Sequence, residues 1–361
     1  MEQENQTSGS RRPRAAARIL AALLAVALVS GLSGPVSAAE AGEMESRTLI
    51  PVGRAVGIKL FADGVMVVGL AQENAAGEDT PARACGLRTG DVITHINSEE
   101  VTSIEEVQQV LQETGGQEMT IRAVRGDKQI QLTAVPAETE QGTYQLGAWI
   151  RDSMAGIGTV TWYDPATGCF AALGHGISDV DTGILMPLES GSIMYATVSG
   201  VKKGIQGTPG QLQGTFQVNN DLGTLVANTG CGIYGKLTDE TMLQGLEPME
   251  VASRSEVKVG PAVILSNIAG DQVEEYQVEI VRVYPDGEDS RDLMLQVTDP
   301  RLLETTGGIV QGMSGSPILQ DGRLVGAVTH VLVNDPTKGY GILAQRMLEQ
   351  AERETQNSTS M

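Results

Sequence analysis

The sequence predicts a mainly β protein, in which a smaller unit with one helix precedes a larger unit made of strands. Glycine is frequent, at 44 of 361 residues, and aromatic residues make up only 3%, a balance that favours turn-rich β structure. From about residue 145 to residue 345, short apolar runs alternate with Gly, Asn and Asp-Pro turns, the pattern of a sandwich or barrel. The length agrees with two domains.

Residues 1–45 are expected to be a targeting segment and a linker. Basic residues precede an apolar run at 19–32, and small residues follow it at 36–38. This order of basic, apolar and small residues predicts a secretory signal peptide. The run is short for a membrane span, so cleavage and retention as an anchor both stay open. In either case, the remainder of the chain should face outward.

Residues 46–137 form the smaller predicted unit. Apolar β-like runs occupy 56–60 and 64–69, and two further strands are expected at 119–125 and 129–135. A helix is predicted over Ile104–Glu113, because its apolar residues recur every three or four positions. Ser103 and Glu106 fit a capping box at the start of that helix.

This unit resembles a PDZ domain, through the stretch Gly-Leu-Arg-Thr-Gly-Asp-Val-Ile at 86–93 and Ile-Asn at 96–97. PDZ domains bind an extended peptide as an added strand and receive its C-terminal carboxylate on backbone amides. The resemblance places those amides at Gly57 and Ile58. The alternative is that the unit only docks against the larger domain.

Residues 138–351 form the larger predicted unit, which is expected to end in a helix over 342–351. Residues 352–361 are expected to be a disordered tail.

The strongest chemical signal is Gly-x-Ser-Gly-x-Pro at 312–317. Small glycines let the backbone turn tightly around Ser314, so the amides of Gly312 and Ser314 can stabilise one oxyanion. An apolar run at 324–328 follows, so the loop lies between strands and not at the strand-to-helix elbow of an α/β-hydrolase. The pattern predicts a chymotrypsin-like double β-barrel serine protease with Ser314 as the nucleophile. Ser316 is the alternative nucleophile.

A serine nucleophile needs a general base, and the chain has three histidines. His175 lies between two glycines after an apolar run and upstream of Ser314, the chain order that a two-barrel protease requires. His95 is expected on a strand of the smaller unit. His330 is expected on a strand after Ser314, where it is either structural or part of the substrate cleft. His175 is therefore the predicted base.

A third residue should orient the imidazole and stabilise its charged form. The candidates are Asp164, Asp179, Asp181 and Asp299. We select Asp299, which ends an apolar run fifteen residues before Ser314.

Charge and cysteine content exclude several classes of protein. The net charge of −20 and the absence of a basic cluster beyond the N-terminus disfavour nucleic-acid binding. Cys85, Cys169 and Cys231 form no CxxC pair, so a structural zinc site is not expected. Three thiols are the default expectation, and a Cys169–Cys231 disulfide is the alternative. The proposed acyl transfer needs no cofactor or metal.

The chain closely resembles the stage IV sporulation protein B peptidase family. The resemblance rests on Ile-Arg-Asp-Ser-Met-Ala-Gly-Ile-Gly-Thr at 150–159, Ala-Leu-Gly-His-Gly-Ile at 172–177, and the run at 306–318. The stretches at 326–331 and 334–341 extend it, and with the PDZ unit it covers about residues 46–348. The family's catalytic histidine, aspartate and serine correspond to His175, Asp299 and Ser314.

The resemblance implies a PDZ-containing serine endopeptidase of spore-forming bacteria. Such proteins cross or stay anchored in the forespore inner membrane and act in the space between the two forespore membranes. They cleave their own N-terminal segment and then a membrane-associated regulator of an intramembrane protease, which leads to activation of a late sporulation sigma factor.

Three alternatives remain at this point. A catalytically silent PDZ scaffold that binds a membrane partner would need neither Ser314 nor His175. A quality-control PDZ protease would place its protease domain first, whereas here the PDZ unit precedes it. A metalloprotease is disfavoured because the sequence has no HExxH motif.

Overall fold

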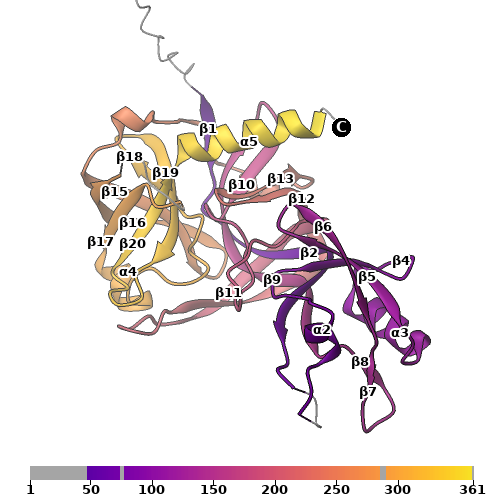
Figure 1. Ribbon diagram of the computed structural model, residues 1–361. Helices are drawn as coiled ribbons and strands as arrows, with labels where there is room; N and C mark the ends of the chain where they lie inside the picture. The colour runs from indigo at the N-terminus through magenta and orange to yellow at the C-terminus, as the bar shows by residue number, and fades with distance from the viewer. Residues whose placement is uncertain (1–46, 74–76, 285–289, 360–361) are drawn as a thin grey trace, which may run out of the picture. The chain divides into compact units, whose positions relative to one another are not determined.

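The computed structural model describes residues 47–73, 77–284 and 290–359 and is mainly β (Figure 1). The predicted signal peptide or anchor lies outside the described residues. Within those ranges, no helix combines the length and the apolar character that a membrane crossing requires.

Six strands close into a first β-barrel. Its strands follow the order β9-β10-β13-β12-β11-β2, and pairing of β2 with β9 closes the ring. The bounds are β2 (Ala55–Leu70), β9 (Ala148–Asp164), β10 (Cys169–Ala172), β11 (Ser190–Lys202), β12 (Gln211–Thr229) and β13 (Gly232–Leu237). β1 (Thr48–Pro51) pairs with β9 and with β14 (Met249–Glu250). Buried Val160, Phe170, Ile193 and Ile233 fill the interior of this barrel.

A second closed barrel follows in the sequence, with the order β15-β16-β17-β20-β19-β18. The bounds are β15 (Gly260–Ala269), β16 (Gln272–Val283), β17 (Leu293–Val297), β18 (Pro317–Gln320), β19 (Arg323–Val331) and β20 (Lys338–Leu343). The short helices are η1 (Thr241–Leu243), η2 (Arg254–Glu256) and α4 (Pro300–Thr306). Two six-stranded barrels confirm the predicted chymotrypsin-like architecture.

The PDZ unit is built on the same sheet as the first barrel. The second half of β2 and the first residues of β9 continue into it and pair with each other. On its other side, β2 pairs at Val65 and Met66 with residues 92–93. Its remaining elements are α2 (Pro81–Ala84), β3 (Val92–Ile96), β4 (Glu99–Glu100), α3 (Ile104–Thr114), β5 (Met119–Arg125), β6 (Lys128–Ala134), β7 (Ala137–Glu138) and β8 (Tyr144–Gln145). The predicted capping box forms, since Ser103 caps α3 together with Glu106.

The division between PDZ unit and protease differs from the predicted boundary at 137/138. Residues 50–51 and 55–61 pair with barrel strands, and residues 148–151 complete the PDZ sheet. The two units therefore share β2 and β9. A sequence pattern does not show this, because each shared strand is one apolar run whose halves have different neighbours.

The C-terminal helix α5 (Ala344–Thr359) starts and ends later than predicted and continues through most of the expected disordered tail. Gln350 donates to Glu354 one turn later, and the Thr355 hydroxyl donates to the Ala351 carbonyl. Arg346 forms an ion pair with the fully buried Asp292 of the second barrel. The two hydrogen bonds stabilise the last turns of the helix, beyond the apolar residues that predicted it, and the ion pair holds its first turn against the second barrel.

Candidate active site

Ser314 lies in a tight loop between α4 and β18. Gly312 and Gly315 both have φ of +98°, a backbone conformation that side chains disfavour. A Cβ atom on Gly315 would lie 2.0 Å from the Thr159 carbonyl oxygen, so this position accepts glycine alone. The local glycine pattern thus produces the predicted turn around the serine.

Thr159 of β9 holds this loop from inside the molecule. Its N–H donates to the Ser314 carbonyl at 3.0 Å, and its hydroxyl donates to the Gly312 carbonyl at 2.8 Å. Thr159 is 1% exposed, so these bonds form in a low-dielectric interior where an unmade bond is costly. Fixing both carbonyls fixes the orientation of the peptide groups around Ser314.

The predicted oxyanion donors are left available by this arrangement. Neither the Gly312 N–H nor the Ser314 N–H donates a hydrogen bond to another described residue. The neighbouring amides are used, since Met313 donates to Val310 and Gly315 donates to Val328. Two unused amides two residues apart on a rigid loop are what oxyanion stabilisation requires.

His175 follows a strained turn at the end of β10. Leu173 and Gly174 both have φ of +69°, which is uncommon for a leucine. The His175 Nδ1 lies 2.8 Å from the Gly176 carbonyl oxygen. Because a carbonyl can only accept, this bond requires the proton on Nδ1 and leaves the Nε2 lone pair for a base. Burial lowers the pKa of His175 below its usual value, although the bond to Gly176 acts in the opposite direction.

Ser314 and His175 line one cleft of about 490 Å³. The Ser314 hydroxyl donates to the Thr329 carbonyl at 2.7 Å, and it makes no hydrogen bond to His175 in this state. Proton transfer therefore requires the hydroxyl to rotate away from Thr329. Catalytic hydrogen bonds are often unmade without substrate.

Asp299 makes no hydrogen bond with His175. It is the N-cap of α4 and accepts hydrogen bonds from the Arg301 and Leu302 amides and from the Gln277 amide. It also pairs with the Arg301 guanidinium at 3.1 Å. Burial raises the pKa of Asp299, but the hydrogen bonds from Arg301 and Gln277 outweigh it and lower the pKa below its usual value. The carboxylate thus has a complete structural role at the start of a helix.

The other predicted aspartates are also engaged elsewhere. Asp164 pairs with Arg47 and receives the Ala166 amide in a turn. Asp179 and Asp181 both pair with Arg151. None of the described residues that line the cleft is an aspartate or a glutamate.

Ser316 and the two remaining histidines are placed clearly. Ser316 is fully buried, and its hydroxyl donates to the Ser266 hydroxyl at 3.1 Å, so it has no access to substrate. His95 lies on β3 of the PDZ unit, as predicted, beside Thr94. His330 lines the catalytic cleft, which was one of its two predicted places.

The three cysteines are free thiols, so the alternative of a Cys169–Cys231 disulfide is wrong.

Gly57 and Ile58 lie in the first barrel and not at the edge of the PDZ sheet. Gly57 pairs with Met194 on one side and Ile157 on the other. A strand that is paired on both sides has no open edge for an added peptide. Ile58 is instead part of the lining of the catalytic cleft.

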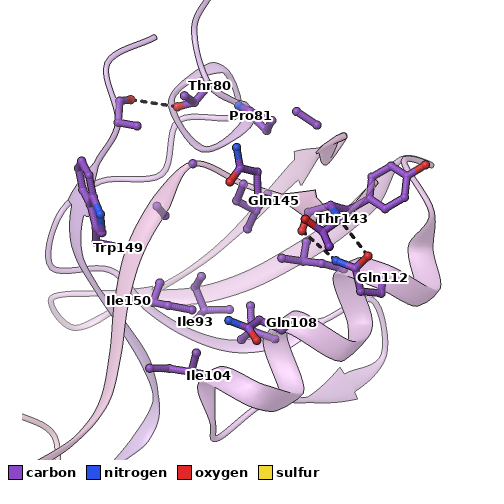
Figure 2. Close-up of a pocket in the computed structure, with 18 of the residues that line it drawn as sticks. Thr80, Pro81, Ile93, Ile104, Gln108, Gln112, Thr143, Gln145, Trp149 and Ile150 are labelled. Atoms are coloured by element: carbon purple, nitrogen blue, oxygen red, sulfur yellow. Dashed lines mark hydrogen bonds between the residues drawn. The ribbon is translucent and has the colours of Figure 1, made fainter. Parts of the chain in front are cut away.

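The PDZ unit has a different open groove, of about 880 Å³, between α3 and the start of β9. Figure 2 shows Gln108 and Gln112 of α3 on one side and Trp149 and Ile150 of β9 on the other. Gln112 fixes the rim by bonding to both the N–H and the carbonyl of Tyr144. The sequence carries a signal for this groove. In Leu146-Gly147-Ala148, a glycine stands between two apolar residues directly before the β run of β9, as in a loop that leads into a strand.

The loop at Leu146–Gly147, at one end of that groove, is held by hydrogen bonds to its carbonyl groups. The Leu146 carbonyl accepts from Ala82 and the Gly147 carbonyl accepts from Ala71, both at 2.9 Å. The N–H groups of Leu146 and Gly147 donate to no other described residue. This is the kind of backbone arrangement that captures a peptide carboxylate.

Parts of the chain are similar to several known proteins. The chain is 40% identical over 62 residues to serine protease HTRA1 of Xenopus laevis, and the match spans 17% of this chain and 13% of that protein. It is similar to the PDZ domain of the SdrC-like protein from Listeria monocytogenes, with 27% identity over 24% of this chain and 87% of that one, at a TM-score of 0.22. It is also similar to the active form of the Rv3671c protease from M. tuberculosis, with 15% identity over 68% of this chain and 83% of that one, at a TM-score of 0.31.

Family models give the more extensive matches. A PDZ domain model matches residues 74–125, and the model of the SpoIVB peptidase S55 family matches residues 142–348. The second match covers more than half of the chain and contains both His175 and Ser314. The chain therefore belongs to the SpoIVB peptidase S55 family and contains a PDZ domain.

Proposed function

We propose that this chain is a serine endopeptidase in which Ser314 is the nucleophile and His175 is the general base. The observation that carries the proposal is that both side chains line one cleft, beside two amides that donate to no other described residue. A silent PDZ scaffold would have no use for this combination.

The reaction is acyl transfer. His175 Nε2 takes the Ser314 proton as Oγ attacks the peptide carbonyl carbon, and the Gly312 and Ser314 amides stabilise the oxyanion. The protonated His175 then gives the proton to the leaving amine as the peptide C–N bond breaks. Water attacks the acyl-enzyme in the same way, with His175 again as base, and restores the serine hydroxyl.

The substrates that we propose are the chain's own N-terminal segment and a membrane-associated regulator of an intramembrane protease. Membership of the SpoIVB peptidase family supports a place in the signalling that activates a late sporulation sigma factor. The N-terminal pattern of basic, apolar and small residues supports export across, or anchoring in, the forespore inner membrane.

The PDZ unit is proposed to bind an extended peptide with a free C-terminal carboxylate in the groove between α3 and β9. The peptide would add to the edge of β9 at Ala148–Ile150, which faces away from β2. The Leu146 and Gly147 amides would receive the carboxylate. This assignment replaces the predicted one at Gly57 and Ile58.

Self-processing tests the proposed activity. The intact mass of the full-length wild type is followed beside Ser314→Ala, His175→Ala and Ser316→Ala. We expect N-terminal clipping in the wild type and in Ser316→Ala, and none in the other two variants. Clipping that persists in purified Ser314→Ala would remove Ser314 as the nucleophile and favour the scaffold function.

A further inference from the structure

Two imidazoles face each other in the catalytic cleft. The ring centroids of His175 and His330 are 5.0 Å apart, and the ring planes are inclined by 35°. Both residues line the cleft that contains Ser314. This distance is van der Waals contact between tilted rings, so the position of one ring restricts the other.

His330 is held at a fixed place relative to the nucleophile. It follows Thr329 on β19, and the Thr329 carbonyl accepts from the Ser314 hydroxyl. The Thr329 side chain is itself bonded to the Ser290 carbonyl at 3.0 Å. The nucleophile loop and β19 are further joined by the Gly315 amide, which donates to the Val328 carbonyl at 2.7 Å. One short segment of β19 thus contacts both reacting residues.

No described carboxylate lines the cleft beside His175. The described residues that line it include no aspartate, glutamate, lysine or arginine, and His175 and His330 are its titratable side chains. The place at Nδ1 that a carboxylate usually occupies belongs to the Gly176 carbonyl. A single backbone acceptor fixes the tautomer but leaves the ring free to tilt about that bond.

We propose that His330 is a positioning residue for His175. Its ring packs against the His175 imidazole and, together with the Gly176 carbonyl, holds it in the plane required for proton transfer with Ser314. This inference rests on the proposed function.

The test uses a fluorophosphonate, which needs no knowledge of the natural substrate. The Ser314 Oγ attacks phosphorus, the P–F bond breaks, fluoride leaves and His175 takes the serine proton. Labelling of the full chain is measured as the maximal inactivation rate and the apparent KI. The variants are His330→Ala, His330→Phe and Ser314→Ala, and His95→Ala is the matched control in the PDZ unit.

His330→Ala should lower the maximal rate at least about 10-fold with little change in apparent KI, because orientation and not binding is lost. His330→Phe keeps a planar ring and should recover the rate to within about 3-fold of the wild type. His95→Ala should match the wild type. The melting temperature of each variant is recorded, so that a loss of folding is not taken for a loss of orientation.

A His330→Ala protein that labels at the wild-type rate overturns the inference. So does a folded His330→Phe protein that is as slow as His330→Ala, because ring packing would then not be the relevant property. Equal labelling of Ser314→Ala and wild type would instead overturn the proposed function. Loss of labelling in Ser314→Ala with normal labelling in His330→Ala would overturn this inference alone.

Discussion

Arg151 of β9 forms an ion pair with Asp179, which lies four residues after His175 in the same loop. The Asp179 carboxylate is fully buried and also accepts from the Asp181 and Thr182 amides. Burial raises the pKa of Asp179, but the bonds from Thr182 and the charge of Arg151 outweigh it and lower the pKa. The next residue of β9, Asp152, accepts from the Ile104 amide at the start of α3. Adjacent side chains on one strand thus contact the His175 loop and the PDZ helix.

Replacing Arg151 should disturb the His175 loop. Arg151→Gln leaves the buried Asp179 charge without its cation, and losing one partner of a buried pair costs up to about 3 kcal/mol of the free energy of unfolding. We expect a lower melting temperature and slower fluorophosphonate labelling. Arg83→Gln, which breaks an exposed pair with Asp79 in the PDZ unit, is the control and should change neither. An Arg151→Gln protein with wild-type labelling would show that the loop is held by its backbone bonds alone.

Thr159→Val should slow acylation. The substitution keeps the side-chain shape and leaves the buried Gly312 carbonyl without the hydroxyl donor, a cost of about 1–3 kcal/mol. Because that carbonyl belongs to the loop that presents the oxyanion amides, we expect labelling to fall about 10-fold.

Thr161→Val is a matched control on the same strand. Its hydroxyl is equally buried but has no hydrogen-bond partner among the described residues. Removing it should leave labelling unchanged and stability unchanged or slightly higher. A similar fall in labelling rate in both variants would mean that β9 tolerates valine at neither position, and would argue against a specific role of the Thr159 hydroxyl.

Asp299 should matter for stability and not for the chemical step. Asp299→Ala removes the N-cap of α4 and should cost about 1–2 kcal/mol of the free energy of unfolding. Asp299→Asn keeps the capping oxygen and should cost less. The labelling rate of the folded protein should stay within about 2-fold of the wild type in both variants. A loss of 100-fold or more in a fully folded Asp299→Asn protein would restore Asp299 as a catalytic residue.

The pH dependence of stability gives an independent check on Asp299. Its pKa is lowered in the folded protein, so the stability it contributes is present above the unfolded pKa of about 4. That contribution is lost as the pH falls through the lower folded pKa. The difference in melting temperature between wild type and Asp299→Asn should therefore shrink below about pH 4. A difference that grows in acid would contradict the assigned role.

The local features of this protein could be predicted from its sequence, whereas the long-range ones could not. The α3 capping box and the turn around Ser314 depend on residues within a few positions of each other, and both formed as predicted. Asp299 caps α4 through the neighbouring Arg301 and Leu302 amides, but it also accepts from the Gln277 amide of β16, and no spacing along the chain reveals that contact. The run at 56–60 predicts the peptide-binding edge of the PDZ unit, but Gly57 is paired on both sides, and the open groove of the PDZ unit follows the β7–β8 hairpin.

Blocking the PDZ groove should abolish peptide binding and leave the folded catalytic site intact. Gln108→Arg places a long, charged side chain in the groove, on the side opposite Trp149. We expect loss of binding to peptides with a free C-terminal carboxylate, measured by fluorescence polarisation on a peptide library. The same peptides with an amidated C-terminus should not bind the wild type. Gln131→Arg, at an exposed position of β6, is the control for added charge, and equal binding by Gln108→Arg would place the peptide site elsewhere.

The central claim is that Ser314 is the activated nucleophile, and mapping the fluorophosphonate adduct by peptide mass spectrometry tests it most directly. The account predicts one adduct on Ser314 in the wild type and in Ser316→Ala, and no adduct in Ser314→Ala or in wild type that is unfolded before labelling. An adduct on Ser316, or no adduct on the folded wild type, would contradict the claim.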